Sequence, residues 1–189
     1  MRDMDNVLPL ATGYATRADV CRTFRQDMKS LYLLSLLLTA GEDSAEQCFE
    51  SSLDDCMDVM PVFKEWTASW TRRVVLQNAI RMLRPAAHRN EDETPQSEVS
   101  SLAPELSPAL GAVLQLDTFE RFVFIMSVLE GYSVHECSLL LRSSKRDVVA
   151  AKANALEHLG PTSGSNEFLF AEPHAEPQFA AMDIRKSTI

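Results

Sequence analysis

The chain has 189 residues, of which 46% are hydrophobic and 24% charged, with 18 Lys and Arg against 27 Asp and Glu. This apolar content suffices for one compact domain or two small ones, and it excludes a collagen-like, mucin-like or wholly disordered chain. The net charge of -9 argues against a protein that coats nucleic acid or anionic lipid through bulk electrostatics. Any contact with nucleic acid must therefore be local.

No segment reads as a membrane span or a secretory signal. The longest apolar run, 31–38, is broken by Ser35 and is much shorter than the roughly 20 residues that cross a bilayer. Residues 1–6 are not followed by the apolar segment of a signal peptide, so we expect a cytoplasmic protein without membrane contacts. The cysteines lack the spacing of a zinc site, so we expect reduced thiols, no metal and no cofactor; they are Cys21, Cys48, Cys56 and Cys137.

Residues 17–84 carry apolar side chains at helical spacing. The first amphipathic stripe comprises Val20, Phe24, Leu31, Leu34 and Leu38. Gly41 is expected to end this helix, and Ser44 with Gln47 has the capping-box spacing that predicts the start of a second one. The outer face of the second helix is acidic and comprises Glu46, Glu50, Asp54, Asp55 and Asp58.

A third helix is predicted after Pro61, which suits a first helical turn. Trp66 and Trp70 are expected to be core anchors, because large aromatic side chains at helical spacing dominate small cores. One surface of this helix is polar and basic and comprises Arg73, Gln77, Arg81 and Arg84, next to Trp70. Each arginine there could equally cover apolar surface with its aliphatic stem.

Two segments break the helical pattern. Residues 85–108 are rich in Pro, Ser and acidic residues, which predicts a flexible acidic linker. Residues 161–189 lack periodicity apart from the apolar triplet 168–170, and we expect an irregular tail.

Residues 109–160 contain unusually explicit helix start and stop signals. Asp117 is a predicted N-cap, Gly131 a predicted stop, and Ser133 with Glu136 a full capping box. The box opens a two-turn helix that ends at Leu141, and the segment 142–144 connects it to a longer final helix. Helix, short turn, longer helix is the layout of a helix-turn-helix.

The run 116–159 resembles the fourth conserved region of bacterial RNA polymerase sigma factors of the extracytoplasmic-function (ECF) group. The matching positions are Arg121, the step Leu129-Glu130-Gly131-x-Ser133, Glu136, Leu141 and Val148. Upstream, the second conserved region of the group is matched by Leu31-Tyr32, Ala45-Glu46-Gln47, Trp70 and Asn78. Two departures stand out: Arg142 occupies the turn where the family commonly has glycine, and 149–151 is apolar where the family has basic residues.

The resemblance implies an all-α protein of two small helical domains joined by a flexible linker. Its parts would be a sigma region 2-like helical domain over 17–84, the linker 85–108, a sigma region 4-like helix-turn-helix domain over 109–160, and the tail 161–189.

The resemblance also implies a transcription initiation factor that binds core RNA polymerase and promoter DNA. The implied polymerase-binding residues are Glu46, Gln47, Glu50 and Asp54. Single-stranded promoter DNA would be held by Arg73, Gln77, Asn78, Arg81 and Arg84. The recognition helix would present Arg142, Ser143, Ser144, Lys145, Arg146, Val149 and Lys152 to duplex DNA.

Other functions remain open at this point. The acidic balance and the apolar segment 149–151 also fit a degenerate sigma-like adaptor that acts through protein contacts alone, and a helix-turn-helix repressor is a third reading. No phosphate-binding loop, zinc-protease motif or nucleophile elbow occurs, so we expect neither an enzyme nor a small-molecule substrate. An anti-sigma protein as a further partner is left open.

Overall fold

The computed structural model describes residues 13–58, 62–87 and 107–160. This part of the chain is helical, apart from an isolated β-bridge between Tyr14 and Phe63, which confirms the all-helical fold class. None of the helices within the described ranges is long and apolar enough to cross a membrane. Pro61, the segment 88–106 of the predicted linker and the predicted tail lie outside the described residues.

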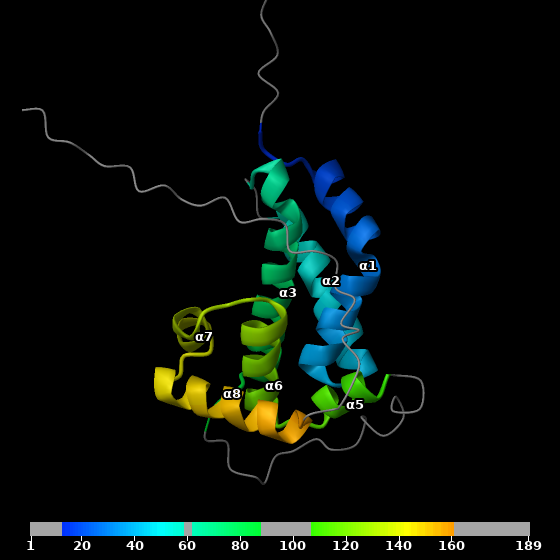
Figure 1. The fold of residues 1–189 in the computed structure, drawn as a ribbon. Helices are drawn as coiled ribbons and strands as arrows, with labels where there is room; N and C mark the ends of the chain where they lie inside the picture. Colours follow the sequence, from blue (N-terminus) through cyan, green and yellow to red (C-terminus); the bar gives the residue numbers. More distant parts are fainter. Residues whose placement is uncertain (1–12, 59–61, 88–106, 161–189) are drawn as a thin grey trace, which may run out of the picture.

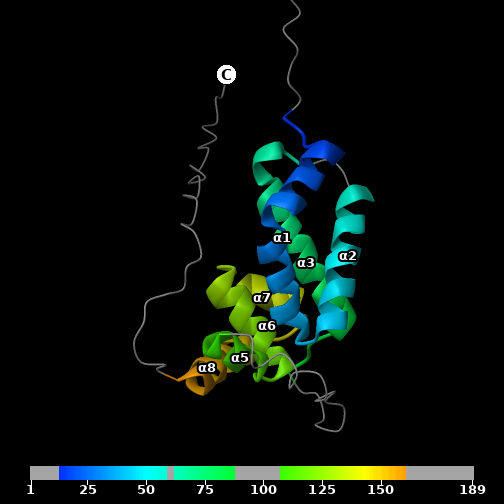
Figure 2. The same cartoon turned by 90° about the vertical axis from the view of Figure 1, so that its right-hand side faces the viewer.

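Residues 13–87 form an N-terminal unit of three long helices. They are α1 (Arg17–Thr39), α2 (Glu42–Asp58) and α3 (Thr67–Leu83), with the short 3-10 helix η1 (Lys64–Trp66) in front of α3. Figures 1 and 2 show the three helices side by side, with their long axes roughly parallel. Leu31, Leu38 and Leu76 are fully buried between them, as the predicted stripe on the first helix requires.

The turn between α1 and α2 differs from the sequence-based prediction. Ala40, with φ of 59°, is the left-handed residue that ends α1, so the prediction that Gly41 fills this role is wrong. The carbonyl of Gly41 already accepts a helical hydrogen bond from the Ala45 amide at 2.9 Å. Helix α2 therefore begins at Glu42, and Ser44 lies inside it rather than at its cap.

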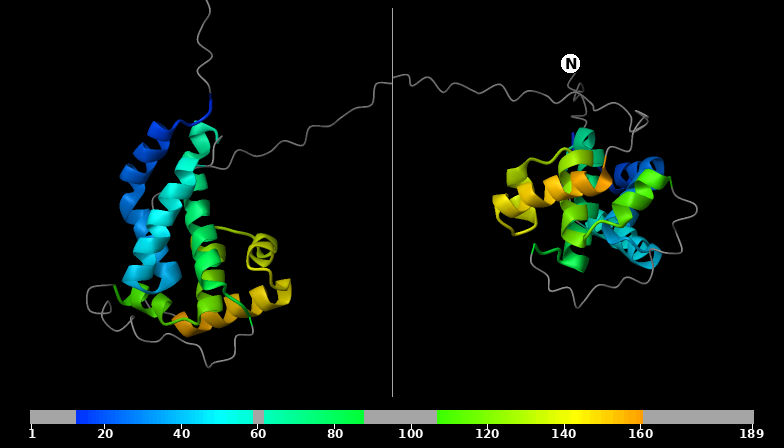
Figure 3. Two further views of the ribbon diagram at one scale, coloured as in Figure 1. Left: turned by 180° about the vertical axis from the view of Figure 1, so that it is seen from behind. Right: turned by 60° about the horizontal axis from the view of Figure 1, so that its bottom comes forward.

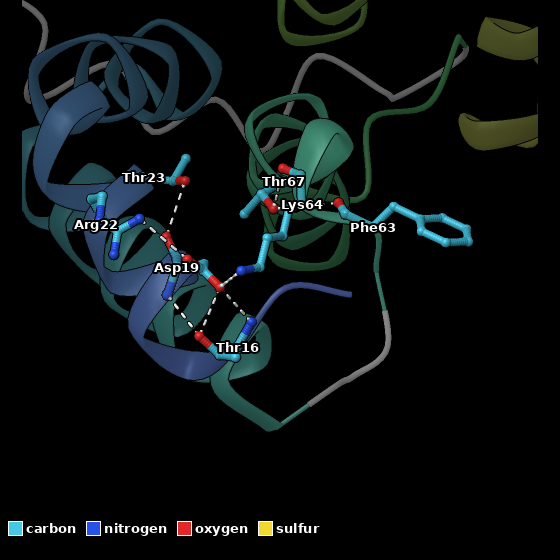
Figure 4. Close-up of polar contacts among 7 residues, drawn as sticks. All are labelled: Thr16, Asp19, Arg22, Thr23, Phe63, Lys64 and Thr67. Atoms are coloured by element: carbon cyan, nitrogen blue, oxygen red, sulfur yellow. Dashed lines mark hydrogen bonds and ion pairs between the residues drawn. The ribbon is translucent and has the colours of Figure 1, made fainter. Parts of the chain in front are cut away.

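The start of α1 is tied to η1 by a compact set of polar contacts, drawn in Figure 4. Thr16 and Asp19 form a reciprocal capping box, and the carboxylate of Asp19 also meets Lys64 Nζ at 3.4 Å. The hydrogen bonds from Thr16, reinforced by Lys64, lower the pKa of Asp19 to about 2. Backbone hydrogen bonds from Ala15 to Val62 at 2.7 Å and from Lys64 to Gly13 at 2.8 Å complete the connection.

Residues 107–160 form a C-terminal unit of shorter helices. They are α5 (Pro108–Leu114), α6 (Thr118–Phe124), the π-helical turn η3 (Ile125–Leu129), α7 (Val134–Leu140) and α8 (Lys145–Leu159). The predicted cap at Asp117 and the predicted capping box of Ser133 with Glu136 are both confirmed. A further box, Ser144 with Asp147, opens α8. Helix α7, its turn and α8 thus have the expected helix-turn-helix layout.

The two units pack against each other. Figures 1 and 3 show α5 and α8 crossing the end of the three-helix unit, and α6 packs against α1. The buried apolar side chains of both units form one continuous cluster. We call the contact between the units the seam.

Arg121 of α6 is the polar centre of the seam. Its side chain is 5% exposed, and its guanidinium donates hydrogen bonds to the carbonyl of Leu38 in the N-terminal unit at 3.4 Å. The same guanidinium donates to the carbonyls of Leu114 at 3.4 Å and Leu116 at 3.1 Å, which lie in its own unit. Burial lowers the pKa of Arg121 to about 10, so the side chain is still charged at neutral pH.

A second polar contact crosses the seam at the end of η3. Arg72 Nε donates to Glu130 Oε2 at 2.9 Å, and Arg72 Nη2 donates to the other carboxylate oxygen. The Glu130 side chain is 9% exposed and the Arg72 side chain 30% exposed. This two-point geometry is the strongest that arginine and a carboxylate can form, and it raises the pKa of Arg72.

Replacing Arg121 by Met should destabilise the protein. The change removes the donor to three buried carbonyls, and each unsatisfied group costs about 1–3 kcal/mol, so we expect a loss of about 3 kcal/mol in the free energy of unfolding. Urea titration followed by circular dichroism measures it. Arg22→Met, in an exposed ion pair with Asp19, is the control and should change the free energy by less than about 0.5 kcal/mol. Equal effects of the two variants would contradict the assigned role of Arg121.

Arg142→Gly should stabilise the fold relative to Arg142→Ala. Arg142, in the turn before α8, has φ of 51°, a left-handed conformation that costs a residue with a Cβ about 1–2 kcal/mol. Both variants lose the guanidinium, but only glycine relieves the backbone, so their melting temperatures isolate the backbone effect. We expect the glycine variant to be more stable by about 1 kcal/mol. A less stable glycine variant would contradict the strain at this position.

Candidate nucleic-acid interface

The N-terminal tip of α8 is open to solvent. Arg142, Lys145 and Arg146 are all exposed, and no segment among the described residues covers them. Ser144 is the N-cap, and its hydroxyl accepts a hydrogen bond from the Asp147 amide at 3.1 Å. Ser143 is half-buried in the turn. The sequence-predicted tip thus presents three exposed basic side chains at the start of a capped helix.

The sides of α8 have different characters. Val148 and Ala151 are buried and attach the helix to the rest of the C-terminal unit. Val149 is 54% exposed and Leu156 is 48% exposed, and they lie on the outer face. Lys152 is half-buried. Beyond its basic tip, the exposed surface of the helix therefore carries apolar side chains at Val149 and Leu156 besides the polar Asn154, Glu157 and His158.

The predicted strand-binding face of α3 is exposed except at Asn78. Arg73, Gln77, Arg81 and Arg84 are exposed. Asn78 is only 2% exposed, and its amide nitrogen donates to Ser52 Oγ at 3.2 Å and to Asp55 Oδ2 at 3.1 Å. Asn78 thus connects α3 to α2, because its side chain points into the three-helix unit rather than out of it.

Trp66 corrects an expectation from the sequence. It is 49% exposed rather than a core anchor, because it lies in η1, where the 3-10 turn places it off the buried face of α3. Trp70, one turn into α3, is half-buried against the core as expected. The sequence-based prediction assumed one α-helical period for both residues, so it placed Trp66 and Trp70 on the same buried face.

Trp66 belongs to an exposed aromatic surface, which we define as Tyr14, Phe63 and Trp66. Tyr14 stacks on Phe63 with ring centroids 4.7 Å apart, and Phe63 meets Trp66 edge to face at 5.3 Å. The Phe63 ring points away from the polar contacts in Figure 4. The surface joins residues far apart in the sequence through the bridge of Tyr14 with Phe63, so sequence spacing alone could not reveal it.

The acidic face of α2 is exposed as predicted. Glu46, Gln47, Glu50 and Asp54 all point to solvent, while Ala45, Cys48, Ser52 and Cys56 face the interior. In Figure 1 the yellow start of α8 lies at the left of the molecule, whereas α2 lies to the right of α3, so the two elements are in separate parts of the molecule. The molecule can present both at once.

The described residues contain no group of His, Cys, Asp or Glu side chains that could hold a metal ion. Cys48, Cys56 and Cys137 are buried free thiols. Burial raises the pKa of Cys56 to about 12, which leaves too little thiolate at neutral pH for nucleophilic chemistry.

No protein-family model matches the chain, and a search of curated proteins finds no match either. The function must therefore be inferred from the geometry of the surfaces described above.

Proposed function

We propose that the protein is a sigma factor-like transcription initiation factor that binds core RNA polymerase and directs it to promoters. The observation that carries the proposal is the solvent-exposed basic tip of α8 within a helix-turn-helix layout. The N-terminal end of the second helix in this motif is the end that contacts base edges in the major groove. A packed or acidic tip would have removed the basis for promoter reading.

Polymerase binding is assigned to the acidic face of α2. Three of its four predicted residues, Glu46, Glu50 and Asp54, are carboxylates. Gln47 stands beside them on the same exposed helical surface, opposite the residues that hold α2 in the unit. A concentrated negative surface of this kind accelerates association with a basic partner and sets its orientation. We assign it to a basic element of the polymerase.

Single-stranded promoter DNA is assigned to the N-terminal unit. Aromatic rings stack on unpaired bases, and nearby cations bind the backbone. The exposed aromatic surface and the exposed arginines of α3 supply both kinds of group. The assignment to strand binding therefore adds Tyr14, Phe63 and Trp66 to the residues implied by the resemblance and omits Asn78.

A second candidate is a sigma-like adaptor that acts through protein contacts. The observation that favours it is the exposed apolar side chain of Val149 near the start of α8, in the segment 149–151 where the family has basic residues. A run-off transcription assay with purified core polymerase separates the two functions. Promoter-specific transcripts support the initiation factor, whereas polymerase binding without transcripts supports the adaptor.

Replacing both Lys145 and Arg146 by Ala should weaken promoter binding. If each side chain contacts a phosphate, affinity falls for all sequences and the slope of log K against log salt decreases by about 0.9 per contact. Fluorescence anisotropy with duplex DNA measures both quantities. Arg25→Ala with Lys29→Ala removes the same charge from the exposed surface of α1 and is the matched control. Equal losses in the two variants would show that only net charge matters.

Reversing the charge of Glu46 and Glu50 to Lys should weaken polymerase binding. Each change replaces an attraction by a repulsion at the proposed contact, so we expect a loss of at least about tenfold, mostly in the association rate at low salt. Surface plasmon resonance with immobilised core polymerase measures the rates. The control is Glu65→Lys with Glu157→Lys, which makes the same charge change on η1 and α8. Unchanged binding of the Glu46 and Glu50 variant would refute the assignment.

A further inference from the structure

Four exposed apolar side chains share one face of α8. Val149 is 54% exposed and Leu156 is 48% exposed, and Ala150 and Ala153 are exposed as well. At about 3.6 residues per turn, the four positions lie within about 120° of the helix circumference, on the side opposite to the buried Ala155. We call this surface, formed by Val149, Ala150, Ala153 and Leu156, the α8 stripe.

Contacts with α6 fix which face of α8 is presented to solvent. Asn154 Nδ2 donates to Glu120 Oε1 at 3.0 Å, and His158 Nδ1 lies 3.3 Å from Glu120 Oε2. These contacts and the buried Val148 hold α8 in one rotation about its axis. In Figures 1 and 2, α8 lies at the lower edge of the molecule, below the other labelled helices. No helix within the described ranges covers the α8 stripe.

Charged side chains of opposite sign stand at the two ends of the α8 stripe. Arg146 lies in the first turn of α8 and Glu157 in the last turn, and both are exposed. At about 3.6 residues per turn, both lie within about 40° of Ala153 and on the same edge of the stripe. At about 1.5 Å per residue they are about 17 Å apart along the helix axis. Neither forms an ion pair within the part of the chain that the structure describes.

This distribution of charge is complementary to itself. If two copies of α8 meet antiparallel about a two-fold axis near the middle of the helix, Arg146 of each copy lies opposite Glu157 of the other. A parallel pair would instead bring Arg146 against Arg146 and Glu157 against Glu157, which is repulsive at both ends. The charges therefore favour a second copy of this chain as the occupant, in the antiparallel orientation.

The apolar side chains fit the same register. In the antiparallel pair Val149 lies against Leu156 of the second copy, so the larger apolar side chains cover each other. Ala150 lies against Ala153 of the second copy. Because these two side chains are small, the helix axes can approach to about 8 Å, the short end of the usual range for packed helices.

We propose that the α8 stripe is the contact surface of a homodimer, in which α8 pairs antiparallel with α8 of a second copy. One face of a 15-residue helix is smaller than the roughly 800 Å² per partner of a standard interface, so the dimer is weak and reversible. The inference goes beyond the proposed function and does not depend on it. Because the contact uses Arg146, a second copy and duplex DNA exclude each other at this side chain.

Sedimentation velocity of the full chain tests the proposal, at protein concentrations from about 10 µM to about 500 µM. About 0.15 M salt limits the repulsion between two chains of net charge -9 to a range of about 8 Å. We expect the average sedimentation coefficient to rise with concentration. Val149→Asp with Leu156→Asp brings carboxylates into the contact and should weaken the dimer by at least about tenfold. Val128→Asp with Leu139→Asp changes exposed apolar residues outside α8 and is the matched control, which should dimerise as the unmodified chain does.

A charge swap tests the antiparallel register and guards against a simple loss of fold. Arg146→Glu replaces two attractive pairs by two repulsive ones, so we expect at least about tenfold weaker association. Arg146→Glu combined with Glu157→Arg restores both pairs, and the double variant should dimerise nearly as strongly as the unmodified chain. Recovery through a second substitution excludes misfolding as the cause of the loss.

Three results would overturn the proposal. A monomer at every concentration leaves the α8 stripe to a different protein partner. A dimer that survives Val149→Asp with Leu156→Asp, or that the control weakens equally, uses another surface. A charge swap that does not restore the dimer contradicts the antiparallel pairing. Because neither DNA nor polymerase enters these measurements, each of these results leaves the proposed function untouched.

Discussion

The buried guanidinium of Arg121 is the interaction on which the arrangement of the molecule depends. A charged group in an apolar interior is costly unless its donors are satisfied, and here backbone carbonyls from α1, α5 and the turn before α6 satisfy them. Those carbonyls belong to both units, so the two can pack only in the register that presents Leu38 to Arg121. Apolar contacts supply the attraction across the seam, and the guanidinium selects one geometry among the many that apolar surfaces would allow.

The elements of the fold could be predicted largely from the sequence, because they depend on local signals. The capping box of Ser133 with Glu136 and the stop at Gly131 act over a few residues, and they begin and end the helices where expected. The turn after α1 was predicted wrongly, since Ala40 takes the left-handed conformation that usually indicates glycine. Local rules only rank residues by preference, and here alanine adopts a conformation that costs it about 1–2 kcal/mol.

The candidate surfaces also divide into residues whose exposure follows from local sequence and residues whose exposure depends on packing between elements. Side chains on the outer face of one helix, such as Glu46 and Lys145, follow from helical periodicity alone. Asn78 and Trp66 do not, because their exposure depends on contacts between elements: the first is drawn inward by Asp55 of α2, and the second is turned outward by η1. The pairing of Arg72 with Glu130 joins positions far apart in the sequence, and no spacing rule connects them.

The capping box at the start of α8 has a consequence for how that helix can touch DNA. Helix N-termini commonly hold phosphates through free amide groups, but here the Asp147 carboxylate and the Ser144 hydroxyl engage each other and the amides of Ser144 and Asp147. A phosphate that came close would meet the negative charge of Asp147. The DNA must then be contacted by the long side chains of Arg142, Lys145 and Arg146 and not by the helix backbone. Their rotatable stems tolerate small differences in groove depth and helix tilt.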